Sequence, residues 1–425
     1  MTFGGFAILL VRKPDDLGCM NDATPPVPPM ARQISVRSVI EAVLHRGPVS
    51  RAELARITGL SKQTMSEVVR ALEDSGWVRP QGQTQGGLGR SAVTYEIERN
   101  AAFVIGVDLG GTKIHVALAN IVGEIIAESV EPTDPDGGMS VVAQIAAMTD
   151  RLMREAKADR AALRSAALGS PGVFDAKSGA ISMAPNIPHL DEIDVAAALR
   201  QQLGCDVRIE NDVNLAAKGE HWRGCCAGRQ SFAFVALGTG VGMGLVINGQ
   251  IVSGARGAAG EIAYLPIGGD PFDSRGMRHG ALETAIGSAA ILDRYRALGG
   301  DTLDVRAMFD RLGEGDIAAA ATLDEIARIL CHALMAIQAI VDPELIVLGG
   351  SIGARPELIE RLRGFIARHL PLPLAVESSA LGSRAAIIGA INVALTALHD
   401  SLFGLAGLQT EFTLPASPAP SQATA

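Results

Sequence analysis

The sequence has few aromatic residues, few cysteines and no membrane-spanning apolar run at its start. Aromatic side chains make up 4% of the 425 residues, and the five cysteines are odd in number and lack metal-ligand spacing. This cysteine usage predicts reduced thiols in the cytoplasm. The apolar stretch Phe6–Val11 is too short to span a bilayer and lacks the flanks of a signal peptide. We therefore expect a cytoplasmic protein with no membrane partner.

The chain also has no overall excess of positive charge. Its net charge of −9 predicts no general affinity for polyanions. Residues 32–95 depart from this average, because they hold nine Lys and Arg against five Asp and Glu. A basic head on an acidic body is typical of a nucleic-acid-binding module joined to a module of another kind. The 48 glycines and 48% hydrophobic residues indicate a globular α/β protein of two or three domains.

Composition divides the chain into four segments. Residues 1–31 carry four prolines between positions 25 and 29 and are predicted to form a disordered leader, with Met20 or Met30 as an alternative start. Residues 405–425 are rich in Pro, Ala and Ser and are predicted to form a disordered tail. Between them we expect a head at 32–99 and a body at 101–404, whose two α/β halves meet near 225–230.

The head has the pattern of a winged helix-turn-helix. Helical spacing of apolar residues or a preceding serine cap predicts three helices: Ser35–His45, Arg51–Thr58 and Lys62–Asp74. A short glycine-containing turn joins the second helix to the third. Two short strands, at 77–79 and 93–97, flank a flexible stretch at 81–90 that we interpret as the wing. The alternative is a small helical domain that contacts other proteins.

The third predicted helix carries the polar residues expected of a recognition helix. In such a module its N-terminal residues meet base edges in the major groove. Gln63 suits adenine, and Lys62 suits guanine or a phosphate. Arginines elsewhere in the head suit phosphate contacts, and Arg90 suits a narrow minor groove. The predicted DNA-binding residues are Arg51, Ser61, Lys62, Gln63, Thr64, Ser66, Arg70 and Arg90.

The body begins with two apolar runs, Phe103–Val107 and Ile114–Ala119, joined by a polar turn. Two strands so closely connected form a hairpin. The turn and its flank supply a carboxylate for a metal ion, two glycines that admit a ligand to the backbone, a hydroxyl and a cation: Asp108, Gly110, Gly111, Thr112 and Lys113. These groups suit a polyphosphate. The alternative is a tight turn with a solvated lysine.

A similar pattern recurs about 130 residues later. The apolar run 231–237 leads into a glycine loop, 238–244, and then into a strand that ends at the hairpin signal Asn248-Gly249. A third apolar strand, 344–350, ends in two glycines, where α/β sheets bind ligands. The repeat predicts a duplicated fold whose halves grip one ligand in the cleft between them. Its predicted nucleotide-binding residues are Gly238, Thr239, Gly240, Gly349 and Gly350.

Three carboxylates belong to the predicted cleft. Val207–Asn214 predicts a short strand followed by a helix that starts at Asn211-Asp212. An Asp beside the cleft can take a proton from a sugar hydroxyl, as the general base of phosphoryl transfer. The alternative is that Asn211 or Asp212 only caps the helix. Glu261 and Glu283 can bind sugar hydroxyls or simply lie at the surface.

Together these motifs resemble the ROK family of repressors and sugar kinases, which has the actin/hexokinase-like (ribonuclease H-like) ATPase fold. The motifs that carry the resemblance lie at 108–113, 210–214, 237–242, 257–261 and 282–283, and the head matches the family's transcription regulators. The resemblance extends over about residues 32–402. It implies that Gly110–Lys113 and Gly238–Gly240 hold ATP phosphates and that Asp212 is the catalytic base. The sugar-binding residues that it implies are Asn186, Asn211, Asp212, Glu261 and Glu283.

One part of the family pattern is missing. Family members usually carry a zinc site, with a His three residues after the Glu of a Gly-Glu pair and three cysteines before a Leu-Glu pair. Here Tyr264 replaces the His, and Ser274, Gly276 and Ala281 stand at the cysteine positions. No tetrahedral ligand set remains, so we expect no zinc. The Tyr264 hydroxyl can still donate a hydrogen bond to a sugar, and we keep Tyr264 among the sugar-binding candidates.

These observations favour a sugar-responsive DNA-binding transcriptional regulator, a repressor of carbohydrate genes that binds operator DNA as a homodimer or homotetramer. Its body is expected to bind a sugar or sugar phosphate, and its DNA binding is expected to require no cofactor. The alternative is a hexose kinase that uses ATP and Mg²⁺ and carries an added DNA-binding head, since Asp212 and both phosphate loops are retained. A third hypothesis is an interaction protein with neither activity.

Overall fold

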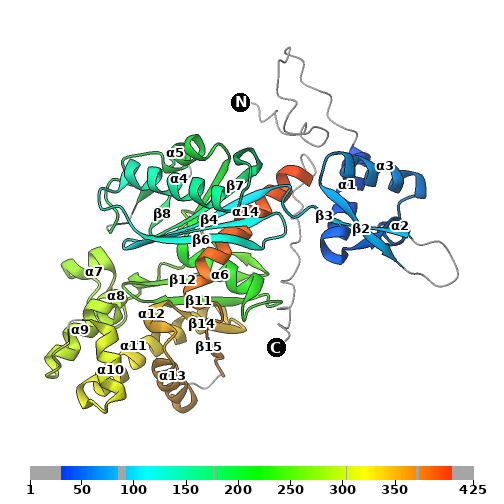
Figure 1. Cartoon of the computed structure of the whole chain (residues 1–425). Helices are drawn as coiled ribbons and strands as arrows, with labels where there is room; N and C mark the ends of the chain where they lie inside the picture. Colours follow the sequence, from blue (N-terminus) through cyan, green and yellow to red (C-terminus); the bar gives the residue numbers. More distant parts are fainter. Residues whose placement is uncertain are drawn as a thin grey trace.

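The computed structural model describes residues 30–84, 92–175, 178–182, 184, 186–302, 304–369 and 373–403 (Figure 1). The predicted tail and most of the predicted wing, including Arg90, lie outside these residues. So does the predicted leader up to residue 29, and a helix already begins at Met30. Within the described residues the chain forms a small head and a larger body of two halves (Figure 1).

The head is a winged helix-turn-helix, as predicted. Its elements are α1 (Met30–Arg46), β1 (Val49–Ser50), α2 (Arg51–Thr58), α3 (Lys62–Asp74), β2 (Val78–Thr84) and β3 (Ala92–Ile97). The strands form a sheet in the order β1-β3-β2. Ser50 and Ser61 cap α2 and α3, accepting hydrogen bonds from the amides of Glu53 and Thr64 at 3.3 and 3.1 Å. Gly59 ends α2 with a φ of 73°, which a glycine adopts without strain.

The first half of the body is built on a five-stranded sheet in the order β10-β7-β4-β5-β6. Its elements in chain order are β4 (Phe103–Leu109), β5 (Lys113–Asn120), β6 (Ile125–Pro132), α4 (Gly138–Glu155), η3 (Arg160–Ala162), β7 (Leu163–Ser170), β8 (Val173–Phe174), β9 (Ile181–Ser182), α5 (Val195–Leu203) and β10 (Asp206–Asn211). β4 and β5 pair as the predicted antiparallel hairpin, and β7 lies parallel to β4. The helix α6 (Asp212–Arg223) follows and leads to the second half.

The second half repeats the arrangement of the first. Its elements are β11 (Phe232–Leu237), β12 (Val241–Ile247), β13 (Gln250–Ile251), η4 (Ile262–Tyr264), α7 (Ser274–His279), α8 (Ala281–Ile286), α9 (Ser288–Ala297), α10 (Val305–Gly313), α11 (Ile317–Val341), β14 (Leu345–Gly349), α12 (Gly350–Gly353), α13 (Pro356–His369) and β15 (Val376–Ser378). Its sheet order, β13-β12-β11-β14-β15, is that of the first sheet read from the opposite edge. The predicted duplication is therefore confirmed.

One predicted loop is shorter than expected. Residues Val241–Ile247 form β12, so Gly242 and Gly244 belong to a strand and only Gly238–Gly240 form the turn. The strand glycines are needed for packing, because a Cβ on Gly244 would lie 2.7 Å from the main-chain oxygen of Val213 in α6. The glycine run thus combines a turn with a surface that receives a helix.

The last helix, α14 (Ala385–Phe403), does not stay with the second half. It follows the turn η5 (Gly382–Arg384) and packs on α6, β4 and β7 (Figure 1). Among the described residues it is the one helix long and apolar enough to span a membrane, but 61% of its apolar window is buried inside the protein. It is therefore a core helix of the first half, and the halves are not simply consecutive in the sequence.

Candidate functional site

The start of α3 presents two polar side chains to solvent. Lys62 and Gln63 are exposed, and the Gln63 amide lies 3.2 Å from the Glu67 carboxylate. Ser61 and Thr64 are engaged with one another in the helix cap, their hydroxyls 2.9 Å apart. The geometry therefore leaves Lys62 and Gln63 as the residues of α3 best placed to reach a base edge.

The other predicted DNA-binding residues lie in different surroundings. The Ser66 hydroxyl donates to the Lys62 carbonyl at 2.9 Å, whereas Arg70 is exposed on α3. The Arg51 guanidinium lies 4.9 Å from the Tyr95 ring centroid and 3.6 Å from the Glu73 carboxylate. Arg51 thus helps hold the head together, and a contact with a phosphate would compete with these partners.

The first glycine loop is fixed by two hydrogen bonds to the main chain of Gly110. Gly110 N–H donates to the Lys113 carbonyl at 2.9 Å, and the Gly110 carbonyl accepts from the Thr133 hydroxyl at 2.6 Å. Gly111, Thr112 and Lys113 are exposed. A Cβ on Gly111 would lie 2.6 Å from the Asn186 side chain, so this loop touches the first predicted sugar-binding residue. The contact with Asn186 requires glycine at position 111, and the rest of the loop is open to solvent.

The second glycine loop lies against the end of β14. Gly238 N–H donates to the Gly240 carbonyl at 3.0 Å, and a Cβ on Gly238 would lie 3.3 Å from the Ser351 hydroxyl of α12. Gly350 has a φ of 79° and packs on the Leu237 main chain. The predicted nucleotide-binding glycine segments of the second half are therefore adjacent. Ser351, which sequence reasoning passed over as a nucleotide-site residue, joins them at the helix start.

Two of the predicted sugar-binding residues, Asn211 and Asp212, lie at the start of α6, next to the first half. Asn211 accepts hydrogen bonds from the amides of Val213 and Asn214 at 3.0 and 3.2 Å, so it does cap the helix. Its side-chain amide also donates to the Gly172 carbonyl at 3.2 Å. Asp212 follows, half-buried, and accepts from the Val213 amide at 2.8 Å. The cap fixes the direction of the Asp212 carboxylate.

Four carboxylates that border the predicted cleft lie in poorly solvated positions, and several of them influence one another through their charges. Burial, assisted by the charge of Asp212 and opposed by Lys113, raises the pKa of Asp108 to about 6. Burial also raises the pKa of Asp212. The pKa of Glu261 is raised by burial and by the charges of Asp212 and Glu283, and burial raises the pKa of Glu283. These carboxylates are poorly solvated, which is the condition in which they gain most from a cation or hydroxyl ligand.

Glu283, another predicted sugar-binding residue, contacts the second glycine loop. Its Oε2 accepts from the Val241 amide at 3.1 Å, and a Cβ on Gly240 would lie 2.5 Å from the same oxygen. His279 Nδ1 lies 3.9 Å from Glu283 Oε1. Sequence reasoning missed His279. Its spacing of four residues from Glu283 gave no usable signal, because Gly280, with a φ of 87°, separates α7 from α8. A side chain at Gly240 would displace Glu283.

The positions of the missing zinc ligands form a hydrogen-bonded turn. The Tyr264 hydroxyl donates to the Arg278 carbonyl at 3.2 Å, and 40% of Tyr264 is exposed. Asp273 caps α7, accepting from the amides of Arg275 and Gly276. Across the described ranges, no group of three or more His, Cys, Asp or Glu side chains is placed to hold a metal ion. Hydrogen bonds from Tyr264 and Asp273 thus organise this turn.

Comparison with known proteins identifies the families of the body and of the head. Residues 104–397 match the model of the ROK family, and residues 35–87 match that of the MarR family. The xylose repressor of Caldicellulosiruptor bescii is 25% identical over 388 residues, which cover 86% of this chain and 96% of that protein. The glucokinase of Thermotoga maritima is 28% identical over 311 residues, covering 68% of this chain and 96% of the relative. For the xylose repressor of Bacillus subtilis the match covers only 61% of the relative.

Solved structures give the same two kinds of neighbour. A ROK family transcriptional regulator superposes with a TM-score of 0.69 at 22% identity, covering 88% of this chain and 98% of that one. At this identity the likeness shows the fold alone. A ROK hexokinase from Thermus thermophilus has a TM-score of 0.59 at 31% identity, covering 70% of this chain and 99% of the hexokinase.

Proposed function

This chain belongs to the ROK family, and we propose on that premise that it is a sugar-responsive DNA-binding transcriptional regulator, a repressor of carbohydrate genes. One observation carries the proposal. The winged head presents Lys62 and Gln63 to solvent, and it shares a continuous apolar core with the half of the body that holds Asp108. A ligand in the cleft therefore has a packed route to the DNA-binding surface.

The ligand of the body is a sugar or a sugar phosphate. Asn186, Asn211, Asp212, Glu261, Tyr264 and Glu283 are its proposed contacts. Relatives named xylose repressor and glucokinase make D-xylose and D-glucose the first probes. The partner is double-stranded operator DNA, bound by a homodimer or homotetramer in the cytoplasm with half-sites about one helical turn apart.

The phosphate side of the cleft fits a nucleotide and its Mg²⁺. Gly111, Thr112 and Lys113 of the first loop and Thr239 of the second are exposed, so main-chain and side-chain donors of both loops are accessible to phosphates. The carboxylate of Asp108 suits the metal ion. These fits favour the second candidate function, an ATP-dependent hexose kinase in which Asp212 accepts the proton of the sugar hydroxyl.

DNA binding is tested by fluorescence anisotropy with the duplex upstream of the chain's own gene. Replacing Lys62 and Gln63 with alanine is expected to weaken specific binding by about 1–3 kcal/mol for each side chain that reads a base. Arg154→Ala, an exposed cation of α4 in the body, is the control and should leave binding unchanged. If the wild-type protein did not bind this duplex at moderate salt, the proposed function as a DNA-binding regulator would be wrong.

Sugar binding and kinase activity are tested with the same purified protein. D-xylose or D-glucose is expected to raise the melting temperature by binding the native state and to release the duplex. Phosphorylation of D-glucose with ATP and Mg²⁺, lost in Asp212→Ala, would establish the kinase and refute a purely regulatory body. Absence of phosphorylation together with a sugar-dependent release of DNA would refute the kinase.

A further inference from the structure

Two connecting segments join the halves of the body. The first, residues 224–231, leads from α6 to β11, and the second, residues 379–384, leads from β15 to α14. Any closure of the cleft must change the backbone of these two connectors, because among the described residues the chain crosses between the halves only there. Their contacts therefore determine how the halves move relative to one another.

Both connectors are bound by a single carboxylate, that of Glu220 near the end of α6. Glu220 is fully buried, with 0% of its surface exposed. Its Oε2 accepts from the Cys225 amide at 2.9 Å and from the Cys225 thiol at 3.3 Å, which ties it to the first connector. Its Oε1 accepts from the Leu381 amide at 2.9 Å and from the Ser379 hydroxyl, which ties it to the second. A buried carboxylate with four donors is a strong, directional joint.

The same joint holds the start of α14 against α6. A Cβ on Gly219 would overlap the Ala385 main-chain oxygen, and a Cβ on Gly389 would overlap that of Leu215. The two helices thus touch backbone to backbone at two glycines and move as one unit. Asp212 begins one of these helices, so the unit starts at the sugar side of the cleft.

The far end of α14 is packed against the head. The Phe403 ring meets Trp77 of the head edge to face, with centroids 5.7 Å apart and an interplanar angle of 83°. His399, fully buried one turn earlier, lies with its Nε2 2.9 Å from the Ile121 carbonyl in the β5–β6 turn. The helix pair therefore spans from the cleft to the head without a flexible break.

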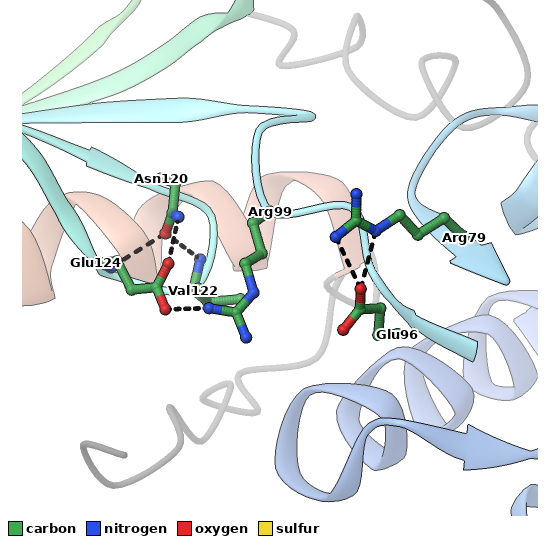
Figure 2. Close-up of polar contacts among 6 residues, drawn as sticks. All are labelled: Arg79, Glu96, Arg99, Asn120, Val122 and Glu124. Carbon is green, nitrogen blue, oxygen red and sulfur yellow. Dashed lines mark hydrogen bonds and ion pairs between the residues drawn. The ribbon is translucent and has the colours of Figure 1, made fainter. Parts of the chain in front are cut away.

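The β5–β6 turn makes a second, polar contact at the same junction. Arg99, which follows the last strand of the head, β3, forms an ion pair with Glu124, and the Asn120 amide donates to Glu124 at 2.9 Å (Figure 2). Asn120 Oδ1 accepts from the amides of Val122 and Glu124 at 3.2 and 3.0 Å, which closes the turn (Figure 2). The Ile121 carbonyl lies within this turn, so the turn and α14 move together at the head.

We propose that Glu220 couples closure of the cleft to the position of the head. We call Glu220 a hinge pin, because it binds both connectors at the hinge between the halves, and we call the helix pair α6 and α14 the lever, because it would carry the motion to the head. Glu220 is a positioning residue, because it touches neither the sugar side nor the DNA surface. The inference rests on the proposed function for its sugar and DNA readouts, but not for its mechanical readout, which needs neither ligand.

The test compares Glu220→Gln with Glu344→Gln in the full chain. The amide introduced by Glu220→Gln would set an N–H group against one pair of donors and so release one connector. Glu344 is the matched control, because its Oε1 accepts from the amides of Gln230 and Ser231 at 2.9 Å each, on the first connector, without binding the second. The amide oxygen of Glu344→Gln can keep both of these bonds, so this variant removes a connector carboxylate and its ion pair with Arg229 without releasing a connector. Only Glu220→Gln separates the two connectors.

The first readout is hydrogen exchange of the ligand-free protein. Glu220→Gln is expected to speed exchange in residues 379–384 and also in residues 395–403, at the head end of the lever, whereas Glu344→Gln leaves 395–403 as in the wild type. Equal exchange at 395–403 in both variants and the wild type would overturn the hinge pin. Should Glu220→Gln not fold, Ser379→Ala removes one donor and is read in the same way.

The second readout is the ratio of DNA dissociation constants with and without D-xylose or D-glucose. A coupled wild type is expected to show a ratio of about 5- to 150-fold, and Glu220→Gln a ratio close to one, while Glu344→Gln keeps the wild-type ratio. If Glu220→Gln showed the wild-type ratio of DNA dissociation constants, the proposed coupling through Glu220 would be wrong. A wild type that ignores both sugars counts against the proposed function, and hydrogen exchange then decides the hinge pin alone.

Discussion

The two halves of the body share a strand order but differ in what they pack against. In the first half, β4 and β7 support α14, and the resulting apolar core continues into the head through Trp77 and Phe403. The second half packs α11 and α13 together, with Tyr295 fully buried at their side, and the other face of its sheet packs on α6 and the start of α14. Among the described residues, none of these buried clusters of the second half includes a residue of the head. The duplicated fold therefore provides one half that is joined to the DNA-binding head by an apolar core and one half that is connected to the head only through α6 and α14.

This difference assigns separate tasks to equivalent loops. The loop of the first half carries Lys113 and follows Asp108, whereas the loop of the second half, Gly238–Gly240, has no cation and borders Glu283. The first half thus holds the charged groups that a phosphate or metal ion needs, and the second half supplies a glycine surface with an acceptor for hydroxyls. A ligand that touches both loops would bridge the half that is joined to the head and the half that is not.

The largest expected effect comes from Phe403→Ala, which breaks the junction between the first half and the head. Phe403 is 3% exposed, and removal of a buried aromatic ring costs about 3–5 kcal/mol. We expect the head to melt separately from the body. Trp77 fluorescence, measured in a Trp222→Phe background, reports the melting of the head. Phe309→Ala in the second half, also 3% exposed, is the control and should lower the stability of the body without separating the head. A single shared transition in Phe403→Ala would contradict the comparison.

Gly389→Ala tests the close contact of α14 with the first half. The new Cβ would overlap the Leu215 carbonyl, and such overpacking costs about 3 kcal/mol because the main chain must shift. Gly364→Ala in α13 of the second half has only the end of the Arg368 side chain near its Cβ, at 3.7 Å, and should stabilise by about 0.5–1 kcal/mol. Urea unfolding measures both, and equal effects would show that the two helices pack alike.

The sequence predicted the parts of this comparison that depend on local signals. The serine caps of α2 and α3 and the hairpin of β4 and β5 follow from short patterns, and the structure confirms them. The repeat of strand and glycine turn also predicted the duplicated sheets, because the same local solution occurs twice. Residue order within about ten positions is sufficient for such features.

The return of α14 and the joint at Glu220 could not be predicted in this way. The partners of Glu220 in the second connector are Ser379 and Leu381, 159 and 161 residues away. Gly242 and Gly244 were assigned to a loop because glycine usually marks a turn, whereas packing against α6 is what requires them. For the site, His279 was missed for a similar reason, since its approach to Glu283 depends on how α7 and α8 meet. Tertiary contacts decide these features.

A smaller effect is expected from His399, through pH. Burial lowers the pKa of His399 to about 4, below its unfolded value near 6.5. The unfolded chain therefore binds a proton between these values while the folded chain does not, so this contribution to stability is complete above pH 6.5 and falls as the pH decreases toward 4. From pH 7 to pH 5 the loss is about 2 kcal/mol.

The test of His399 is a difference between variants. The cleft carboxylates act in the opposite direction, because a raised pKa makes the folded chain bind protons more tightly, and the wild-type curve mixes both effects. His399→Gln can still donate to Ile121 and should remove the His399 part of the slope. Parallel curves for wild type and His399→Gln would contradict the assignment.

The smallest effect is expected from Arg99→Ala at the polar side of the head junction. Arg99 and Glu124 are 49% and 36% exposed at their side chains, and ion pairs in such solvated positions contribute about 0.2–1 kcal/mol (Figure 2). The melting temperature should therefore change little, in contrast to Phe403→Ala at the apolar side of the same junction. Arg99→Ala should nevertheless speed hydrogen exchange in the turn at residues 120–124, because Glu124 loses its external partner while Asn120 still closes the turn. A loss of stability as large as that of Phe403→Ala would mean that charge, and not apolar packing, joins the head to the first half.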